Sequence, residues 1–156
     1  MTTLRQAAEI LANYPVLSAD GYEPTAINGT FIVPAGVAAN DVIEMVALPA
    51  GYVPLDVTLD TEDLDTATAS SLNVGILSGD YGVVDNTRVC GAEFIAASTI
   101  GQTGGIARMA VMGATRIAPT TNDRGVGIKV VAAAGTPVVG AKIGLTLWCR
   151  PAINGA

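Results

Sequence analysis

Residues 142–150 read Lys-Ile-Gly-Leu-Thr-Leu-Trp-Cys-Arg, and this stretch decides the fold class. Its apolar side chains stand at alternate positions, namely Ile143, Leu145, Leu147 and Cys149. Because successive side chains of a β-strand point to opposite faces, the alternation predicts a strand with one buried and one solvent-facing side. Trp148 falls on the solvent-facing side, where we expect it to cover a sheet edge or to contact a partner.

Further strands are predicted upstream, in short apolar segments separated by glycine and proline. They are residues 30–33, 42–48, 53–59, 72–77, 88–97, 106–112 and 125–132. Segment 106–112 also fits a helix, but its two-residue periodicity and flanking glycines favour a strand. Together with 142–150 this makes about eight strands, which predicts an all-β, jelly-roll-like sandwich.

Details of these segments make specific predictions. In 42–48 we expect Glu44 on the face opposite to Ile43, Met45 and Ala47. In 53–59 we expect one buried face, made of Val53, Leu55, Val57 and Leu59. The repeated Pro-Ala-Gly at 34–36 and 49–51 predicts two similar turns.

The N-terminal region is predicted to differ from the rest. Leu4, Ala7, Ala8 and Leu11 recur at helical spacing, and Arg5 and Glu9 are four residues apart, so we expect a short helix that ends at Tyr14-Pro15. An extended arm follows. The sequence therefore divides into a helix and arm at 1–28 and a β-sandwich domain at 29–156.

Charge is unevenly distributed along the 156 residues. Residues 1–100 hold 13 acidic and two basic residues, whereas residues 101–156 hold one acidic and six basic residues. The net charge of −6 disfavours nucleic acid as a partner. Either the two halves neutralise each other within one domain, or complementary faces meet between copies of the chain.

The composition argues against an enzyme and against a metal or cofactor site. The chain has no histidine, which excludes Ser-His-Asp triads and His-containing metal sites. The acidic loop from Asp60 to Asp65 lacks the glycine and closing glutamate of a calcium loop, so we expect it to be solvated. Cys90 and Cys149 are expected to be reduced, with a bridge between them as the alternative. We predict no catalytic, cofactor-binding or metal-binding residues, and no membrane-spanning segment.

Two regions carry a resemblance to a known family. One is Asp123-Arg-Gly-Val-Gly-Ile-Lys-Val-Val with Gly135-Thr-Pro and the stretch from Gly140 to Pro151, and the other is the stretch from Val53 to Asp65 with 72–77. Both resemble small structural proteins of tailed bacteriophages that decorate, or cement, the head. The chain departs from that pattern at Cys149, where the family leads us to expect tyrosine.

The resemblance implies a jelly-roll module that binds the outer surface of the capsid as a trimer and stabilises the expanded shell. It implies the major capsid protein and further copies of the chain as partners, synthesis in the bacterial host cytoplasm and a final location on the virion. The alternatives are another virion component, such as a tail or head-fibre protein, and a soluble β-sandwich binding domain.

Overall fold

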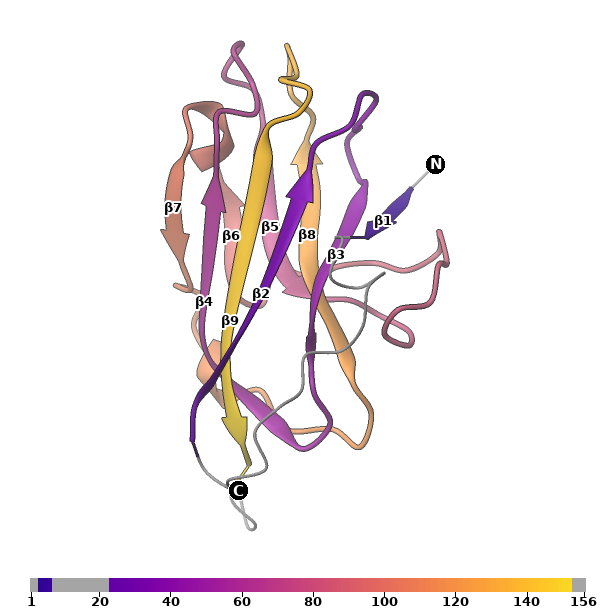
Figure 1. Ribbon diagram of the computed structural model, residues 1–156, viewed down its shortest axis with the longest axis vertical. Coiled ribbons are helices and arrows are strands. Elements are labelled where there is room, and N and C mark those ends of the chain that lie inside the picture. Colours follow the sequence, from indigo (N-terminus) through magenta and orange to yellow (C-terminus); the bar gives the residue numbers. More distant parts are fainter. Residues whose placement is uncertain (1–2, 7–22, 153–156) are drawn as a thin grey trace.

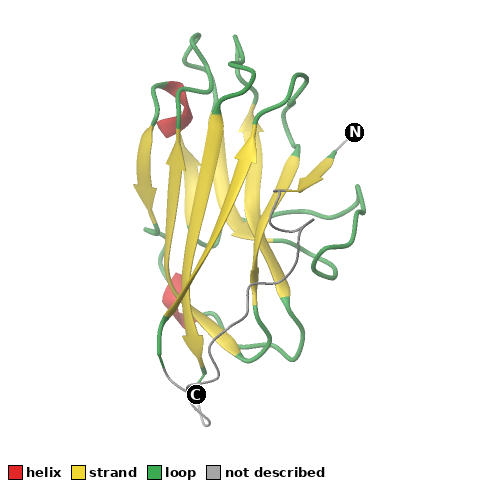
Figure 2. Ribbon diagram, viewed as in Figure 1, coloured by secondary structure: helices red, strands yellow, loops and turns green. Residues whose placement is uncertain are grey.

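The computed structural model describes residues 3–6 and 23–152 and folds them into two packed β-sheets (Figure 1). Strands are the main regular structure in this part of the chain, with two single-turn 3-10 helices (Figure 2). The strands are β1 Leu4–Gln6, β2 Thr25–Ile32, β3 Val42–Leu48, β4 Tyr52–Thr61, β5 Ser71–Ile76, β6 Ile95–Ser98, β7 Gly105–Arg108, β8 Arg124–Ala132 and β9 Lys142–Pro151. The helices are η1 Ile100–Gln102 and η2 Ala114–Arg116. No helix in the described residues has the length and apolar character to cross a membrane.

The strands form a five-stranded sheet in the order β1-β3-β8-β5-β6 and a four-stranded sheet in the order β2-β9-β4-β7. All pairs are antiparallel except β1 and β3, which are parallel. Neighbouring strands are often far apart in sequence, since β2 pairs with β9 and β3 with β8. The predicted jelly-roll-like β-sandwich is therefore confirmed.

Strand β9 has the predicted two faces. Ile143, Leu145, Leu147 and Cys149 are buried between the sheets, while Lys142 and Trp148 are exposed. Two neighbours, β2 and β4, flank β9, so Trp148 lies on the open face of a central strand and does not cover a sheet edge. The main core between the sheets also contains Phe94, Leu59 and Ile128.

Strand β4 departs from the predicted alternation in its first half. Val57 and Leu59 are fully buried as expected, but Val53 and Leu55 are only half-buried, and Pro54 is buried instead. The register of β4 against β9 shifts between Pro54 and Asp56. A bulge of this kind adds one residue to a strand and reverses the faces on either side of it, which explains why the prediction was wrong at Val53 and Leu55.

The N-terminus also differs from the prediction. Residues 4–6 form β1, a parallel edge strand beside β3, and not the first turn of a helix. The backbone of residues 4–6 pairs with β3, and the Gln6 side chain donates a hydrogen bond to Glu44. These contacts take the place of the hydrogen bonds that a local helix would form. Residues 7–22 of the predicted helix and arm lie outside the described residues. Strand β2 begins at Thr25, within the predicted arm, and the division at residues 28 and 29 stays a prediction.

The remaining strands and turns follow the sequence closely, although two strands are shorter. Of 88–97, only the end belongs to β6, and of 106–112, only the start belongs to β7. Both Pro-Ala-Gly segments form turns, in which Gly36 and Gly51 adopt φ of 78° and 74°. Glycine adopts this left-handed conformation without the steric cost that a Cβ adds.

A second, smaller core lies on the other face of the five-stranded sheet. It consists of Leu4, Val42, Leu77 and Cys90. The connection between β5 and β6 covers this face, to the right in Figure 1, and the Leu4 side chain of the edge strand β1 completes the small core. Because both faces of the sheet are covered at β3, all seven residues of this strand are buried. They include Glu44, which we expected on the face opposite to Ile43, Met45 and Ala47.

Candidate functional site

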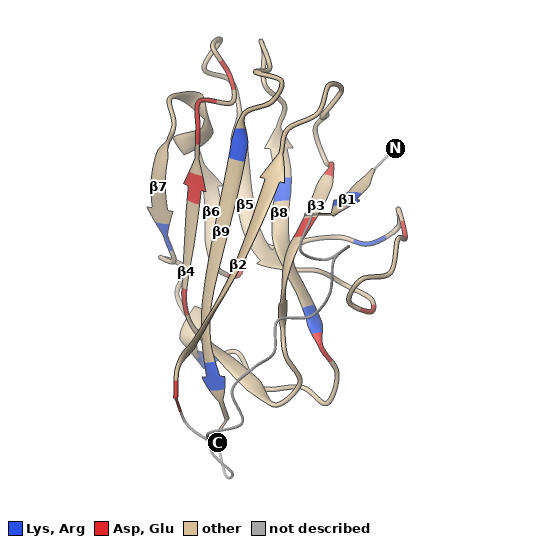
Figure 3. Cartoon of the chain, in the orientation of Figure 1, with Lys and Arg blue, Asp and Glu red and all other residues tan. Residues whose placement is uncertain are grey.

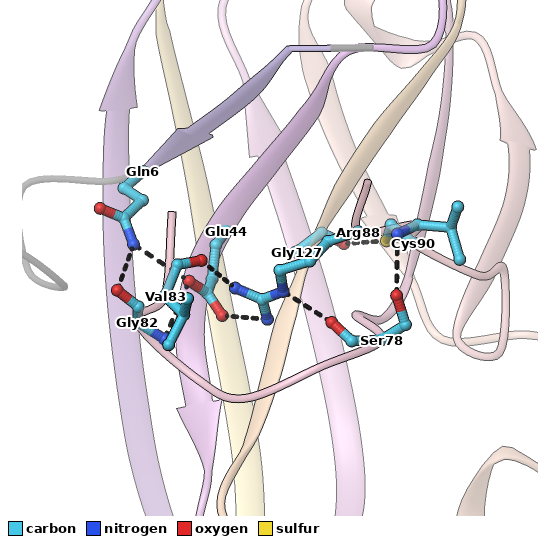
Figure 4. A network of polar contacts seen from close by, with 9 residues as sticks. Gln6, Glu44, Ser78, Gly82, Val83, Arg88, Cys90 and Gly127 are labelled. Atoms are coloured by element: carbon cyan, nitrogen blue, oxygen red, sulfur yellow. Dashed lines mark hydrogen bonds and ion pairs between the residues drawn. The ribbon is translucent and has the colours of Figure 1, made fainter. Parts of the chain in front are cut away.

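The most elaborate polar site holds the connection between β5 and β6 against the sheet (Figure 4). We call residues 78–89 the β5–β6 loop. Its base is closed by a bridge between Leu77 and Cys90 and by hydrogen bonds between Ser78 and Val89. The loop projects from the five-stranded sheet beside β1 (Figure 1).

Arg88 makes the central contacts of this site. Its Nη2 donates to Oε1 of Glu44 at 2.7 Å, and both side chains are buried, with exposed fractions of 2% and 0%. Its Nε donates to the Ser78 carbonyl at 2.6 Å and its Nη1 to the Val83 carbonyl at 2.9 Å. One guanidinium thus joins both arms of the loop to β3.

The second carboxylate oxygen of Glu44 receives two further donors. They are the Gly82 backbone N–H and the side-chain amide of Gln6, each at 3.2 Å. The Gln6 amide also donates to the Gly82 carbonyl at 3.2 Å. Buried charges are stable only when paired and hydrogen-bonded, and here the pairing fixes β1, β3 and the loop together.

A second carboxylate fixes the start of the chain. Asp41 is buried and accepts hydrogen bonds from the backbone N–H groups of Thr3 and Ala38, at 3.1 and 3.0 Å. The Arg5 Nε lies 3.3 Å from Oδ2 of the same carboxylate, which makes an ion pair. Strand β1 therefore has a polar anchor at each end, Asp41 and Glu44.

The surface of the β5–β6 loop is apolar above its polar base. Val83, Val84 and Val89 are 50%, 70% and 63% exposed. Exposed apolar side chains on a fixed support are typical of surfaces that bind other proteins. The sequence prediction missed this site. A lone Glu44 within an apolar strand, and Arg88 as one of only two basic residues in the first 100, were the available signals.

The outer face of the four-stranded sheet is a second exposed surface. Trp148 is aligned between Ala26 on β2 and Asp56 on β4. Asp56 pairs with Arg108 on β7, and Ile32 and Ile106 are exposed on the same sheet. This face thus combines an aromatic residue with a small neighbour, an ion pair and exposed apolar side chains.

The ion pairs of the described residues leave the charge asymmetry largely in place. Only Arg108 and Asp56 join the basic residues 101–156 to the acidic residues 1–100, whereas the other two pairs lie within residues 1–100. Neutralisation between the two halves therefore rests on one exposed ion pair in this part of the chain.

The acidic loop at Asp60 to Asp65 is only partly solvated, so that prediction was wrong for Leu64 and Asp65, which are buried. The Asp65 carboxylate accepts hydrogen bonds from the N–H groups of Thr136, Ala67, Ala69 and Ser70 at 2.6 to 3.0 Å. The bond from Thr136, followed by those from Ala69 and Ala67, lowers the pKa of Asp65 well below its usual range despite desolvation. No group of three or more metal-ligating side chains occurs in residues 3–6 and 23–152.

The two cysteines are free thiols in separate places. Cys90 lies in the small core under the β5–β6 loop, and Cys149 lies in the main core. Desolvation raises the pKa of Cys90 to about 12, with a further contribution from Glu93, and it raises the pKa of Cys149 to about 11. The alternative, a disulfide between Cys90 and Cys149, is therefore not present in the structure.

The chain is thus a β-sandwich with two exposed surfaces that contain apolar side chains, and comparisons with known proteins place it more closely. No protein-family model and no curated protein matches the sequence. Among solved structures, the chain is similar to one in "Capsid of Ralstonia phage GP4", with 37% identity, a TM-score of 0.90 and coverage of 97% of this chain and 99% of that chain. The chain therefore belongs to the family of phage capsid proteins that this Ralstonia phage chain represents.

Two other capsid structures contain similar chains. A chain of the cyanophage Pam1 capsid asymmetric unit is 25% identical, with a TM-score of 0.65 and coverage of 89% of this chain and 93% of that chain. A chain from the acidic stable capsid of Helicobacter pylori bacteriophage KHP30 is 16% identical, with a TM-score of 0.52 and coverage of 82% of this chain and 88% of that chain. The second likeness concerns the fold alone.

Proposed function

We propose that the chain is a decoration, or cement, protein of a phage capsid. In this role it binds the outer surface of the expanded shell as a homotrimer, contacts the major capsid protein and braces the shell mechanically. It is made in the bacterial host cytoplasm, ends up on the virion surface, and acts without catalysis or a cofactor.

The similarity to the Ralstonia phage GP4 capsid chain carries this proposal. It extends over 97% of this chain and 99% of the other, so the two chains match over nearly their full lengths. The resemblance to head decoration proteins in residues 53–77 and 123–151 supports the same role.

The structure supports a mechanical role through its anchored surface. A brace must transmit force without unfolding locally, and local unfolding is least favourable where backbone and side chains are buried and paired. The β5–β6 loop is tied to β3 through Arg88 and Glu44 and to β1 through Gln6, while it exposes three valines. The loop is therefore suited to a protein contact that bears load.

The test is reconstitution on shells that lack the protein. Expanded capsids without the chain are mixed with purified protein, washed and imaged by cryo-electron microscopy, and unexpanded capsids serve as the control. We expect added density at symmetry axes of the expanded shell, together with a higher shell-melting temperature. Shells that gain neither density nor thermal stability would contradict the proposal.

The trimer is tested separately by light scattering. The monomer mass is 15.7 kDa, and we expect a solution mass three times as large. A mass that stays at the monomer value both in solution and in density on the shell would exclude the trimer.

A further inference from the structure

The two ends of the sandwich differ in charge, with several acidic residues at the top of Figure 3 and several arginines at the bottom, although Lys142 lies beside Glu62 at the acidic end and Asp123 precedes Arg124 at the other. The connection from β4 to β5 carries acidic residues at one end, at the top of the figure. Arginines gather at the other end, where η2 contributes Arg116, β8 begins at Arg124 and β9 nearly ends at Arg150. The arginine cluster and the acidic connection therefore lie at different ends of the sandwich.

The arginine end contains a pocket of about 190 Å³. Arg116 and Arg150 line it together with Val53, Ile117 and Pro119. Guanidinium groups beside apolar walls suit a carboxylate on a short hydrocarbon stem, because the stem contacts the walls and the charge meets the donors.

These arginines have unused donors. Within the described residues, Arg116, Arg124 and Arg150 form no ion pair. Arg150 donates to the Pro151 carbonyl and Arg124 to the Ala118 carbonyl, at 3.2 and 3.1 Å. The buried Arg124 Nε has no hydrogen-bond partner among residues 3–6 and 23–152.

The acidic end has carboxylates available for contact. Asp60, Glu62 and Asp63 are exposed. Glu62 accepts one hydrogen bond, from the Lys142 N–H, and the Asp60 carboxylate accepts none from the described residues. Asp65 does not contribute, because four backbone N–H groups already surround its carboxylate.

We infer that the pocket between Arg116 and Arg150 receives a carboxylate from the Asp60–Asp63 edge of a second copy of this chain. The inference rests on the self-association in the proposed function and specifies its interface. Contacts between different ends of identical subunits are heterologous, and such contacts close into a ring when the rotation between subunits allows it. A trimer is one such ring. Complementary charge would favour this head-to-tail order over head-to-head contacts.

Charge reversal tests the inference on the full chain. Arg116→Glu and Glu62→Lys each reverse one end, and Arg116→Glu/Glu62→Lys exchanges the charges. Lys129→Glu on β8 and Asp85→Lys in the β5–β6 loop are matched controls with the same change of charge outside the two clusters. Asp60→Lys is a second acidic-end variant, because that side chain has no hydrogen bond to lose within the described residues. Circular dichroism confirms folding, and sedimentation equilibrium at low and high salt measures association.

Each end variant should weaken association by about tenfold or more at low salt, because like charges would then meet. The double variant should regain part of the loss, and the controls should match wild type. High salt should weaken wild-type association. Folded end variants that associate as wild type does, a double variant without recovery, or a wild-type chain that stays monomeric would each overturn the inference. Capsid decoration by the wild-type chain is measured in a separate experiment. The inferred interface can therefore be overturned while the proposed function holds, and the proposed function can fail while the interface is observed.

Discussion

Two ion pairs in this molecule each join an arginine to a carboxylate, but one pair is buried and the other is exposed to solvent. Arg88 and Glu44 are 2% and 0% exposed, with every nitrogen of the guanidinium donating to a protein acceptor. Arg108 and Asp56 lie on the outer face of the other sheet, at 71% and 22% exposed. The first pair holds a loop in place, whereas the second leaves its surface free to contact something else. Burial therefore decides which charges are structural.

Removing one partner of the buried pair should have the largest effect. Arg88→Met leaves the Glu44 carboxylate buried without its cation and frees the Ser78 and Val83 carbonyls. We expect a loss of about 3–5 kcal/mol in the free energy of unfolding, measured by urea denaturation.

The double variant Glu44→Leu/Arg88→Met is the control for that loss. Because it removes both charges and keeps apolar volume, it should be more stable than Arg88→Met alone. Arg88→Met within about 1 kcal/mol of wild type would show that the pair does not anchor the loop.

The space around the buried pair can be tested with a methyl group. A Cβ added at Gly125 would lie 3.0 Å from Nη2 of Arg88 and would clash with Oε1 of Glu44. Gly125→Ala should therefore cost about 1–3 kcal/mol of unfolding free energy, as overpacking does.

The matched control is Gly144→Ala on β9. The nearest atoms to a Cβ there belong to Asp60 and lie at 3.7 Å or more, which is ordinary contact. Alanine also has less backbone entropy to lose than glycine. We expect unchanged or slightly higher stability, and equal losses at both glycines would argue against a crowded ion pair.

A third buried charge, Asp65, predicts a dependence on pH. Hydrogen bonds from Thr136 and its neighbours lower the folded-state pKa of Asp65 below its unfolded value of about 3.9. Its stabilising contribution is therefore complete above about pH 4 and is lost as the pH falls toward the folded pKa.

Thermal melts of wild type and Asp65→Asn across an acid series measure this effect. The variant should melt at lower temperature at neutral pH, and the gap should narrow as the pH falls below about 4. A gap that is constant with pH would show that ionisation of Asp65 contributes nothing.

The smallest change is expected at the exposed pair. Arg108→Ala should alter the free energy of unfolding by about 0–1 kcal/mol, because solvent already screens the two charges. The same urea titration measures it. A loss as large as that of Arg88→Met would remove the distinction between the two pairs.

Strand patterns made most of the fold predictable. The spacing in 142–150 and 42–48 located β9 and β3 because one or both faces of each strand are apolar. The pattern could not locate the bulge before Asp56, which depends on how β4 meets β9. Nor could helical spacing at 4–11 reveal that residues 4–6 pair with β3, since strand pairing across 38 residues is a tertiary effect.

The candidate site was less predictable than the fold. Glu44 and Arg88 are 44 residues apart, and nothing local connects them. The burial of Asp65 depends on Thr136, which is 71 residues away. Sequence patterns report which side chains are apolar, whereas these sites depend on which loops fold back over a sheet.

A cryo-electron microscopy map of the native phage particle would locate the chain without reconstitution. We expect the β-sandwich on the outer surface of the capsid, in groups of three at symmetry axes, with the β5–β6 loop in a protein contact. Density for the chain in the tail or a head fibre, and none on the shell, would contradict this expectation.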